Sequence, residues 1–209
     1  MARPSAFALV VGCLLVSCAS SSFVPPTPEA AAYRQALLEI READQAPRNR
    51  YVALLRRYDY QPPDSLRLPL AREVLVADSV NLVRFEALVE AHGWPKASEV
   101  GAWAARSGFL VIQHADLKTQ LRYEPLLRDA VGAGEGEAAD LALLTDRILV
   151  RQGQPQRYGS QTRTDPETGA RSFYPIEDRA TLDARRATVG LTPMAEYARE
   201  MDVPWPPDD

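Results

Sequence analysis

The sequence predicts a mainly α-helical protein, a compact bundle of about six to eight helices with one small β-hairpin near residues 155–175. Apolar residues recur at spacings of three and four along most of the chain, which is the period of an amphipathic helix. Proline, glycine and hydroxyl residues stand where helices usually begin and end. Only after Gln154 does the pattern change, to two short β-prone runs on either side of a turn.

The N-terminal segment is typical of a bacterial lipoprotein signal peptide. One charge, Arg3, precedes an apolar run over residues 6–16, which is too short to span a bilayer as a helix. The run ends in Leu15-Val16-Ser17-Cys18, which resembles the lipobox at which lipoproteins are cut before a lipidated cysteine. We therefore expect Cys18 to carry the acyl chains that attach the protein to a membrane. The alternative is an ordinary signal peptide with an incidental cysteine.

This interpretation divides the chain into four parts. With Cys13 removed and Cys18 lipidated, the rest of the chain has no thiol for a disulfide, so its stability must come from a hydrophobic core. The expected location is the cell envelope, at the outer membrane if the host has one. The parts are a signal peptide (1–17), a lipidated cysteine with a Ser/Pro tether (18–28), a single helical domain (29–202) and a Pro-rich tail (203–209).

The first helices are predicted from their capping signals. Thr27-Pro28-Glu29 supplies a capping hydroxyl, a proline for the first helical position and an acid for the first turn. Pro47 is expected to kink or restart this helix. A second helix is expected to end near Gly93, since glycine followed shortly by Pro95 is a stop signal. The apolar face of the first helix contains Tyr33, Leu37 and Ile40, and Asp44 continues it.

The later elements follow from the same reasoning. A helix over residues 98–112 is apolar nearly all round, which predicts a central position in the domain. Helices are expected over 117–131 and 138–150, and the hairpin is expected to pair residues 157–162 with 171–174. Two short helices then follow. Arg185-Arg186 is interpreted as a solvated helix face, with one of the two arginines reaching Asp178 or Asp183.

Composition excludes several classes of function. The formal net charge of −4, without a basic block, argues against nucleic acid as a partner. With two histidines and no available cysteine, neither a metal site nor a cofactor is expected. The chain also lacks a nucleophile elbow, a phosphate-binding loop, a dinucleotide fingerprint and a metalloprotease motif.

An ordered series of polar and turn residues runs through the predicted domain. The series comprises Asp44-Gln45 with Arg48, His92-Gly-Trp-Pro95 with Ser98 and Gly101, Gln113-His-Ala-Asp116, Asp146-Arg147, Gln156-x-Tyr158-Gly159-Ser160-Gln161, Pro175-Ile-Glu-Asp178, Arg185-Arg186 and Gly190-Leu191. From Ala30 to Met201 this series resembles a bacterial family of domains of unknown function, family 6624. Pro47 beside the Asp-Gln pair departs from the pattern. The resemblance implies candidate residues and no particular reaction.

The candidate site consists of polar residues in apolar surroundings. Asp44, His114, Asp146 and Arg147 all lie on or beside apolar helix faces, and burying them is costly unless they pair. We therefore expect them to converge on one polar cluster. In it His114 would be the general acid or base, oriented by Asp44 or Asp146. The candidate binding residues for an anionic or amide-bearing ligand are Gln45, Arg48, Gln113, Arg147, Gln156, Tyr158 and Gln161.

The sequence allows two interpretations of this cluster. The same groups can satisfy one another inside a helical bundle and do no chemistry. The favoured function is a membrane-anchored binding or structural module of the envelope, whose partner is an unknown small molecule or envelope protein. The alternative is a small metal-independent hydrolase or transferase that uses the His/Asp/Arg cluster. A weaker third possibility is docking to another protein through the hairpin tip or the Trp205 tail.

Overall fold

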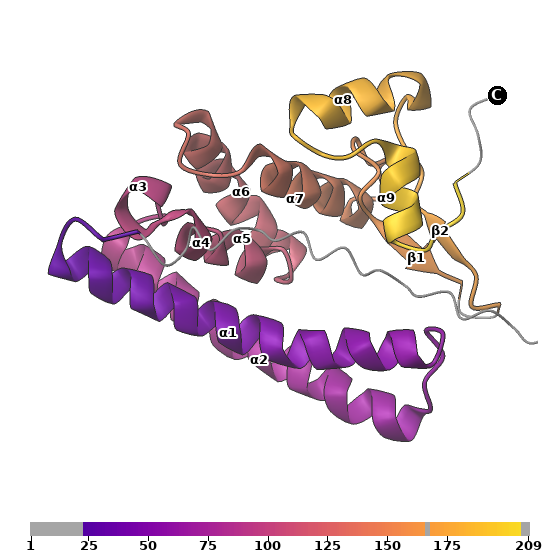
Figure 1. Cartoon of the computed structure of the whole chain (residues 1–209), viewed down its shortest axis with the longest axis horizontal. Coiled ribbons are helices and arrows are strands. Elements are labelled where there is room, and N and C mark those ends of the chain that lie inside the picture. The colour runs from indigo at the N-terminus through magenta and orange to yellow at the C-terminus, as the bar shows by residue number, and fades with distance from the viewer. Residues whose placement is uncertain (1–22, 166–167, 206–209) are drawn as a thin grey trace, which may run out of the picture.

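The computed structural model describes residues 23–165 and 168–205. It is mainly helical with one small antiparallel hairpin, which confirms the predicted fold class. Helices α1 and α2 form a long antiparallel pair along one side of the molecule (Figure 1). Helices α3, α4 and α5 lie against this pair, α6 and α7 pack on α5, and α8, α9 and the hairpin gather at the far end of α7.

Helix α1 (Pro28–Arg57) begins as its capping signal predicts. The Thr27 hydroxyl accepts a hydrogen bond from the Ala30 amide, and Pro28 occupies the first helical position. The expected restart at Pro47 is wrong, because α1 runs through this buried proline as one element. Packing along α2 (Asp64–His92) holds α1 together across the hydrogen bond that a proline cannot make.

The expected central helix over residues 98–112 is divided into three. Gly101 interrupts it with φ 80° and a turn at Arg106 divides it again, so the segment forms α3 (Ala97–Val100), α4 (Ala102–Ala105) and α5 (Ser107–Ile112). The predicted central position is confirmed for α5, in which every residue is buried. The core around it includes Tyr33, Leu37, Ile40, Phe85, Val100, Phe109, Ile112, Tyr123, Leu127, Leu144 and Ile148.

Helices α6 (Leu117–Gly132) and α7 (Ala138–Arg151) pack on each other close to their predicted bounds. The Asp116 carboxylate caps α6 by accepting a hydrogen bond from the Thr119 amide. Helix α7 has a buried residue at every second position from Asp140 to Ile148, so more than one of its faces is buried: Leu144 and Ile148 join the core, whereas Asp146 contacts the loop before the hairpin.

The C-terminal part begins with the predicted hairpin. Its strands are β1 (Thr162–Thr164) and β2 (Arg171–Phe173), and Thr162 pairs with Phe173. The first strand therefore starts where the expected one was to end. A 3₁₀ turn (Arg179–Thr181), α8 (Leu182–Thr188) and α9 (Met194–Glu200) follow. The described part of the tail packs on the domain, with Val203 buried and Trp205 against Phe173 at 5.7 Å between ring centroids.

The expected signal peptide and the lipidation site Cys18 lie outside the described residues. Within residues 23–165 and 168–205, none of the helices has the length and apolar character needed to cross a membrane.

Candidate functional site

The predicted polar residues form two groups with different hydrogen bonding, and the first group is built around Asp146. Its fully buried carboxylate accepts hydrogen bonds from the backbone amides of Arg157 (2.7 Å), Tyr158 (2.9 Å) and Ser160 (2.9 Å). These three hydrogen bonds are charge-assisted, and they join α7 to the loop that leads to the hairpin. Asp146 therefore anchors this loop.

Gln156 completes the same loop from within. Its Nε2 donates to the carbonyls of Gln161 (3.0 Å) and Tyr174 (2.9 Å), and its Oε1 accepts from the Gln161 amide (2.7 Å). The Gln161 side chain in turn donates to the Ser160 hydroxyl. The side-chain amides of Gln156 and Gln161 therefore have structural hydrogen-bond partners within the protein.

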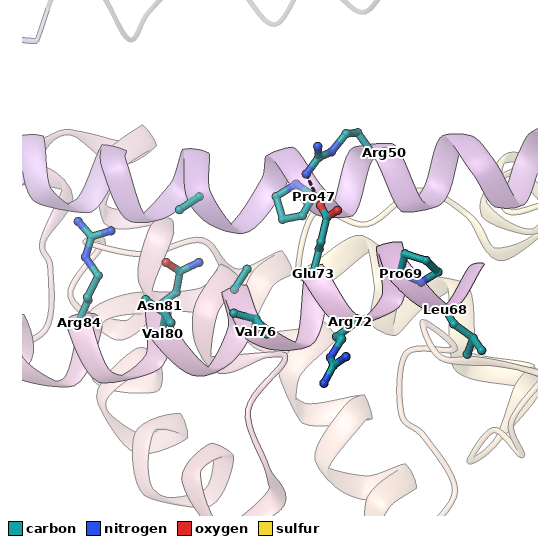
Figure 2. Close-up of a pocket in the computed structure, with 12 residues that line it drawn as sticks. Pro47, Arg50, Leu68, Pro69, Arg72, Glu73, Val76, Val80, Asn81 and Arg84 are labelled. Carbon is teal, nitrogen blue, oxygen red and sulfur yellow. Dashed lines mark hydrogen bonds and ion pairs between the residues drawn. The ribbon is translucent and has the colours of Figure 1, made fainter. Parts of the chain in front are cut away.

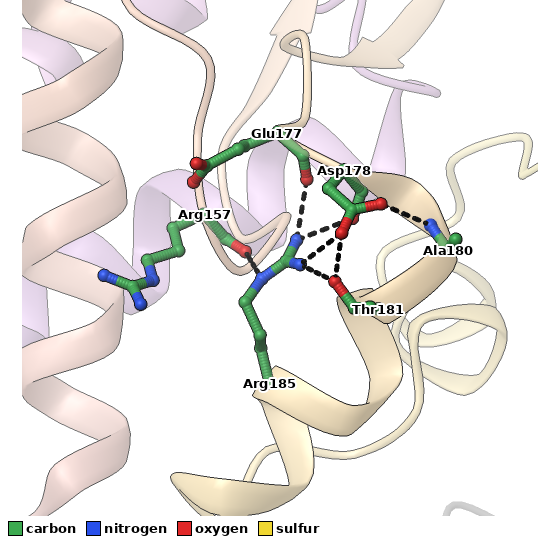
Figure 3. A network of polar contacts seen from close by, with 6 residues as sticks. All are labelled: Arg157, Glu177, Asp178, Ala180, Thr181 and Arg185. Carbon is green, nitrogen blue, oxygen red and sulfur yellow. Dashed lines mark hydrogen bonds and ion pairs between the residues drawn. The ribbon is translucent and has the colours of Figure 1, made fainter.

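Two arginines of α8 hold the loop from the other side. The buried Arg186 donates to the carbonyls of Thr192 (2.6 Å) and Tyr158 (2.5 Å) and lies over the Tyr197 ring. Arg185 donates to the carbonyls of Arg157 (2.9 Å) and Glu177 (2.6 Å), as Figure 3 shows. The expected solvated face is therefore wrong: because loop carbonyls surround this face of α8, both guanidinium groups serve as internal donors.

The Asp178 pair expected for these arginines is present. Arg185 lies 3.7 Å from the Asp178 carboxylate, which also accepts hydrogen bonds from the Thr181 hydroxyl and the Ala180 amide (Figure 3). Hydrogen bonding to Thr181 lowers the pKa of Asp178. The loop, the 3₁₀ turn and α8 thus form one saturated polar network.

The second group lies on the face of α1 and α2 that is turned to the core. Asp44 is 1% exposed and accepts a hydrogen bond from Gln45 Nε2 at 2.6 Å. Arg48, one turn later, lies 3.5 Å from the Asp44 carboxylate and forms an ion pair with Asp78 of α2. Burial raises the pKa of Asp78, against the lowering effect of Arg48.

His114 and Arg147 extend this group. Burial, with the charges of Arg48, Arg147 and Arg151, lowers the pKa of His114 to about 3, so the ring is neutral at pH 7. Burial, with the charges of Arg151 and Arg48, lowers the pKa of Arg147 to about 10. Arg151 also donates to the Ala115 carbonyl, next to His114. These electrostatic effects place the histidine in a cationic environment.

Three buried polar atoms of this group have no hydrogen-bond partner among the described residues: Asp44 Oδ1, Arg48 Nε and Arg147 Nε. Such atoms are rare in native proteins, because each one carries a desolvation cost. The second group therefore differs from the saturated first group in having two donors without an acceptor and a carboxylate oxygen that is held only by an ion pair at 3.5 Å. Free donors beside several cations can hold an anion.

The structure thus separates residues that the sequence grouped together. The charges of Arg48 and Arg147 act on His114, and Arg48 joins Asp44. Asp146, Gln156 and Gln161 face the loop, since backbone amides and carbonyls are their partners, and the Tyr158 amide and carbonyl are likewise used there. The Gln113 carbonyl accepts a hydrogen bond from the Gln120 side chain at 2.8 Å, which gives its backbone a structural contact.

Two members of the second group were missed at the sequence level. Asp78 follows Val74 by four residues and precedes Asn81 by three, so it shares a buried face of α2 and was detectable from that spacing. Arg151 follows Arg147 by one helical turn. Its role depends on the position of the turn after α5, which local spacing does not reveal.

Within the described ranges, no group of three or more histidine, cysteine or acidic side chains is arranged to hold a metal ion. Searches of curated proteins and of solved structures give no match to this chain. A family model described as "Family of unknown function (DUF6624)" matches residues 31–205. This range contains nearly every described element, including both polar groups, and the chain belongs to this family of unknown function.

Proposed function

We propose that the protein is a lipid-anchored binding module of the cell envelope, and that its ligand is a small oxyanion held by Arg147. The observation that carries the proposal is the buried Nε of Arg147, which has no acceptor among the described residues. A buried cation without a counter-charge is costly for the folded state. A bound carboxylate or phosphate would remove that cost, since a guanidinium binds either through two parallel hydrogen bonds.

The neighbours of Arg147 support an anionic ligand. Arg48 contributes a second buried Nε without a partner, and Arg151 adds positive charge. Asp44 and Asp78 are both engaged by Arg48, so they compensate that arginine and leave Arg147 unbalanced. Asp44 Oδ1 has an ion pair with Arg48 at 3.5 Å but no hydrogen bond, and it would accept one from a hydroxyl or amino group on the same ligand.

The state of His114 favours binding over acid–base catalysis. A general base works best when its pKa lies near the working pH, and the pKa of His114 is lowered to about 3. The neutral ring is therefore a weak base and carries no proton to deliver at pH 7. It still offers one donor and one acceptor, which suits a group that contacts a ligand.

Thermal unfolding of the full chain in the presence of simple oxyanions tests the proposal. The probes are acetate, succinate, phosphate and sulfate at constant ionic strength. We expect at least one of them to raise the melting temperature, with a stabilisation of about 2.7 kcal/mol at a concentration 100-fold above its Kd. Arg147→Met should abolish this rise, and the exposed Arg199→Met on α9 is the matched control.

Two results would overturn the proposed ligand class. The first is a melting temperature that none of the four anions raises. The second is a rise that Arg147→Met retains, because the anion would then act elsewhere on the surface.

The membrane anchor is tested separately by the mass of the protein made in a bacterial host. We expect cleavage before Cys18 and an added diacylglycerol, and Cys18→Ser should lose both. An unmodified cysteine in the exported protein would contradict lipid anchoring and leave the anion site unaffected.

A further inference from the structure

A groove of about 810 Å³ lies between α1 and α2, beside the second polar group (Figure 2). Ala43 and Pro47 line it from α1, each one position before Asp44 and Arg48. Adjacent helix positions point about 100° apart, and neither Asp44 nor Arg48 lines the groove. The groove therefore needs its own explanation.

The α2 side of the groove is an exposed apolar stripe. Leu68, Val76 and Val80 line it and are 53%, 56% and 52% exposed. Val83, further along the same helix, is also exposed. Apolar residues at helical spacing normally face a core, and a continuous exposed stripe marks an interaction surface.

Two polar features lie in the same groove. Asn81 is 1% exposed, lines the groove, and has an Nδ2 without a hydrogen-bond partner among the described residues. Pro47 has no amide hydrogen, so the Ala43 carbonyl lacks its usual helical donor. Figure 2 shows Pro47 directed toward α2 and Asn81 directed toward α1. The groove thus offers a buried donor to an occupant.

The charges at the rim identify the kind of occupant. Arg50, Arg72 and Arg84 line the groove with a single acid, Glu73. Arg50 pairs with Glu73 at 2.6 Å and Arg84 pairs with Glu39 at 3.3 Å, whereas Arg72 has no ion pair within the described ranges. A second copy of the chain would bring two positive rims together. An acidic occupant is complementary.

We infer that this groove is the docking site for an acidic amphipathic helix of a partner protein. The apolar stripe of that helix would pack on Leu68, Val76 and Val80, as in other helix-in-groove complexes. One of its carboxylates would pair with Arg72, and a polar side chain would accept a hydrogen bond from Asn81. The inference does not rest on the oxyanion site, because Asp44, Arg48 and Arg147 are not among the residues that line the groove.

A pair of synthetic helical peptides of about 18 residues tests the inference. Both carry leucine at helical spacing, and they differ only in having glutamate or lysine beside the leucines. Fluorescence anisotropy with the full chain should show binding of the glutamate peptide and binding of the lysine peptide weaker by about tenfold or more. Val80→Arg and Arg72→Glu should each weaken the binding of the glutamate peptide by about tenfold or more.

The matched control is Leu121→Arg, which changes an exposed leucine of α6 outside the groove lining and should leave binding unchanged. Because Val80 and Leu121 are both exposed, neither change should disturb the fold, and far-UV circular dichroism checks this. The inference is overturned if neither peptide binds at about 100 μM, which would be weaker than a specific helix-in-groove contact. Equal binding of the two peptides, or binding that Val80→Arg leaves intact, also overturns it. A dimer of the full chain that Val80→Arg dissociates would assign the groove to a second copy instead.

Discussion

Asp146 and Arg147 are neighbours on α7, and their surroundings are opposite. The Asp146 carboxylate accepts three backbone hydrogen bonds, whereas the Nε of Arg147 has no acceptor among the described residues. The Asp146 charge is fully buried and compensated by the fold, whereas the partly exposed Arg147 side chain keeps a buried Nε without a compensating acceptor. The comparison teaches that the balance of partners, more than burial itself, separates a structural polar group from a candidate binding group.

The two environments also differ in how the chain builds them. The partners of Asp146 lie 11 to 14 residues later, in a loop that folds back onto α7. The group around Arg147 draws on α1, α2, α7 and the turn after α5. A local loop can supply backbone amides to a nearby carboxylate, whereas a long-range group assembles side chains whose charges need not cancel.

Asp146→Asn should give the largest loss of stability. The amide keeps the side-chain volume, but its NH₂ group faces at least one backbone donor that needs an acceptor. We expect a loss of about 2–3 kcal/mol in the free energy of unfolding. Urea denaturation measures it, with Asp129→Asn, at an exposed site on α6, as a control that should stay within about 0.5 kcal/mol of the parent. A similarly small effect of Asp146→Asn would contradict the claim that Asp146 stabilises the fold.

Gly159→Ala tests how tightly the anchored loop packs. Gly159 has φ 71°, and an added Cβ would lie 2.9 Å from Met194 Sδ. Gly153 has a similar φ of 73° with no atom within 4 Å, so Gly153→Ala carries the backbone cost of about 1 kcal/mol alone. We expect Gly159→Ala to cost about 1 kcal/mol more than Gly153→Ala by urea denaturation. Equal losses in the free energy of unfolding would show that the loop shifts to accommodate the new methyl group.

The second polar group should make the stability of the protein depend on pH through His114. Folding lowers its pKa from 6.5 to about 3, so the unfolded chain takes up the proton first as the pH falls. Stability is therefore unaffected above about pH 6.5 and declines below it, by at most about 1.4 kcal/mol per pH unit. Unfolding free energies of the parent and His114→Gln between pH 7 and 5 measure this contribution. Parallel pH profiles for the two proteins would contradict it.

Local signals predicted much of the fold. Thr27-Pro28-Glu29 and Gly93 mark helix ends by their own chemistry, and the structure places the ends there. The break at Gly101 was missed because a lone glycine inside an apolar run is compatible with a helix. The structure shows that this position requires glycine, since its φ is positive and a Cβ there would lie 2.7 Å from Arg34 Nη1.

The candidate site was predictable only in part, for a related reason. A polar residue on an apolar helix face signals burial, and this identified Asp44, Asp146 and Arg147 as members of polar groups. It does not reveal which of them a loop will satisfy. The partners of Asp146 are backbone amides, which every residue carries, so no sequence pattern separates it from Arg147.

The most direct test of the comparison is the free energy of unfolding of Arg147→Met, measured beside the parent in an oxyanion-free buffer. If Arg147 is held open for a ligand, replacing it by an apolar side chain of similar length should leave stability unchanged or raise it by up to about 1 kcal/mol. A loss of about 2 kcal/mol, comparable to that expected for Asp146→Asn, would show that Arg147 is a structural residue and would contradict the account.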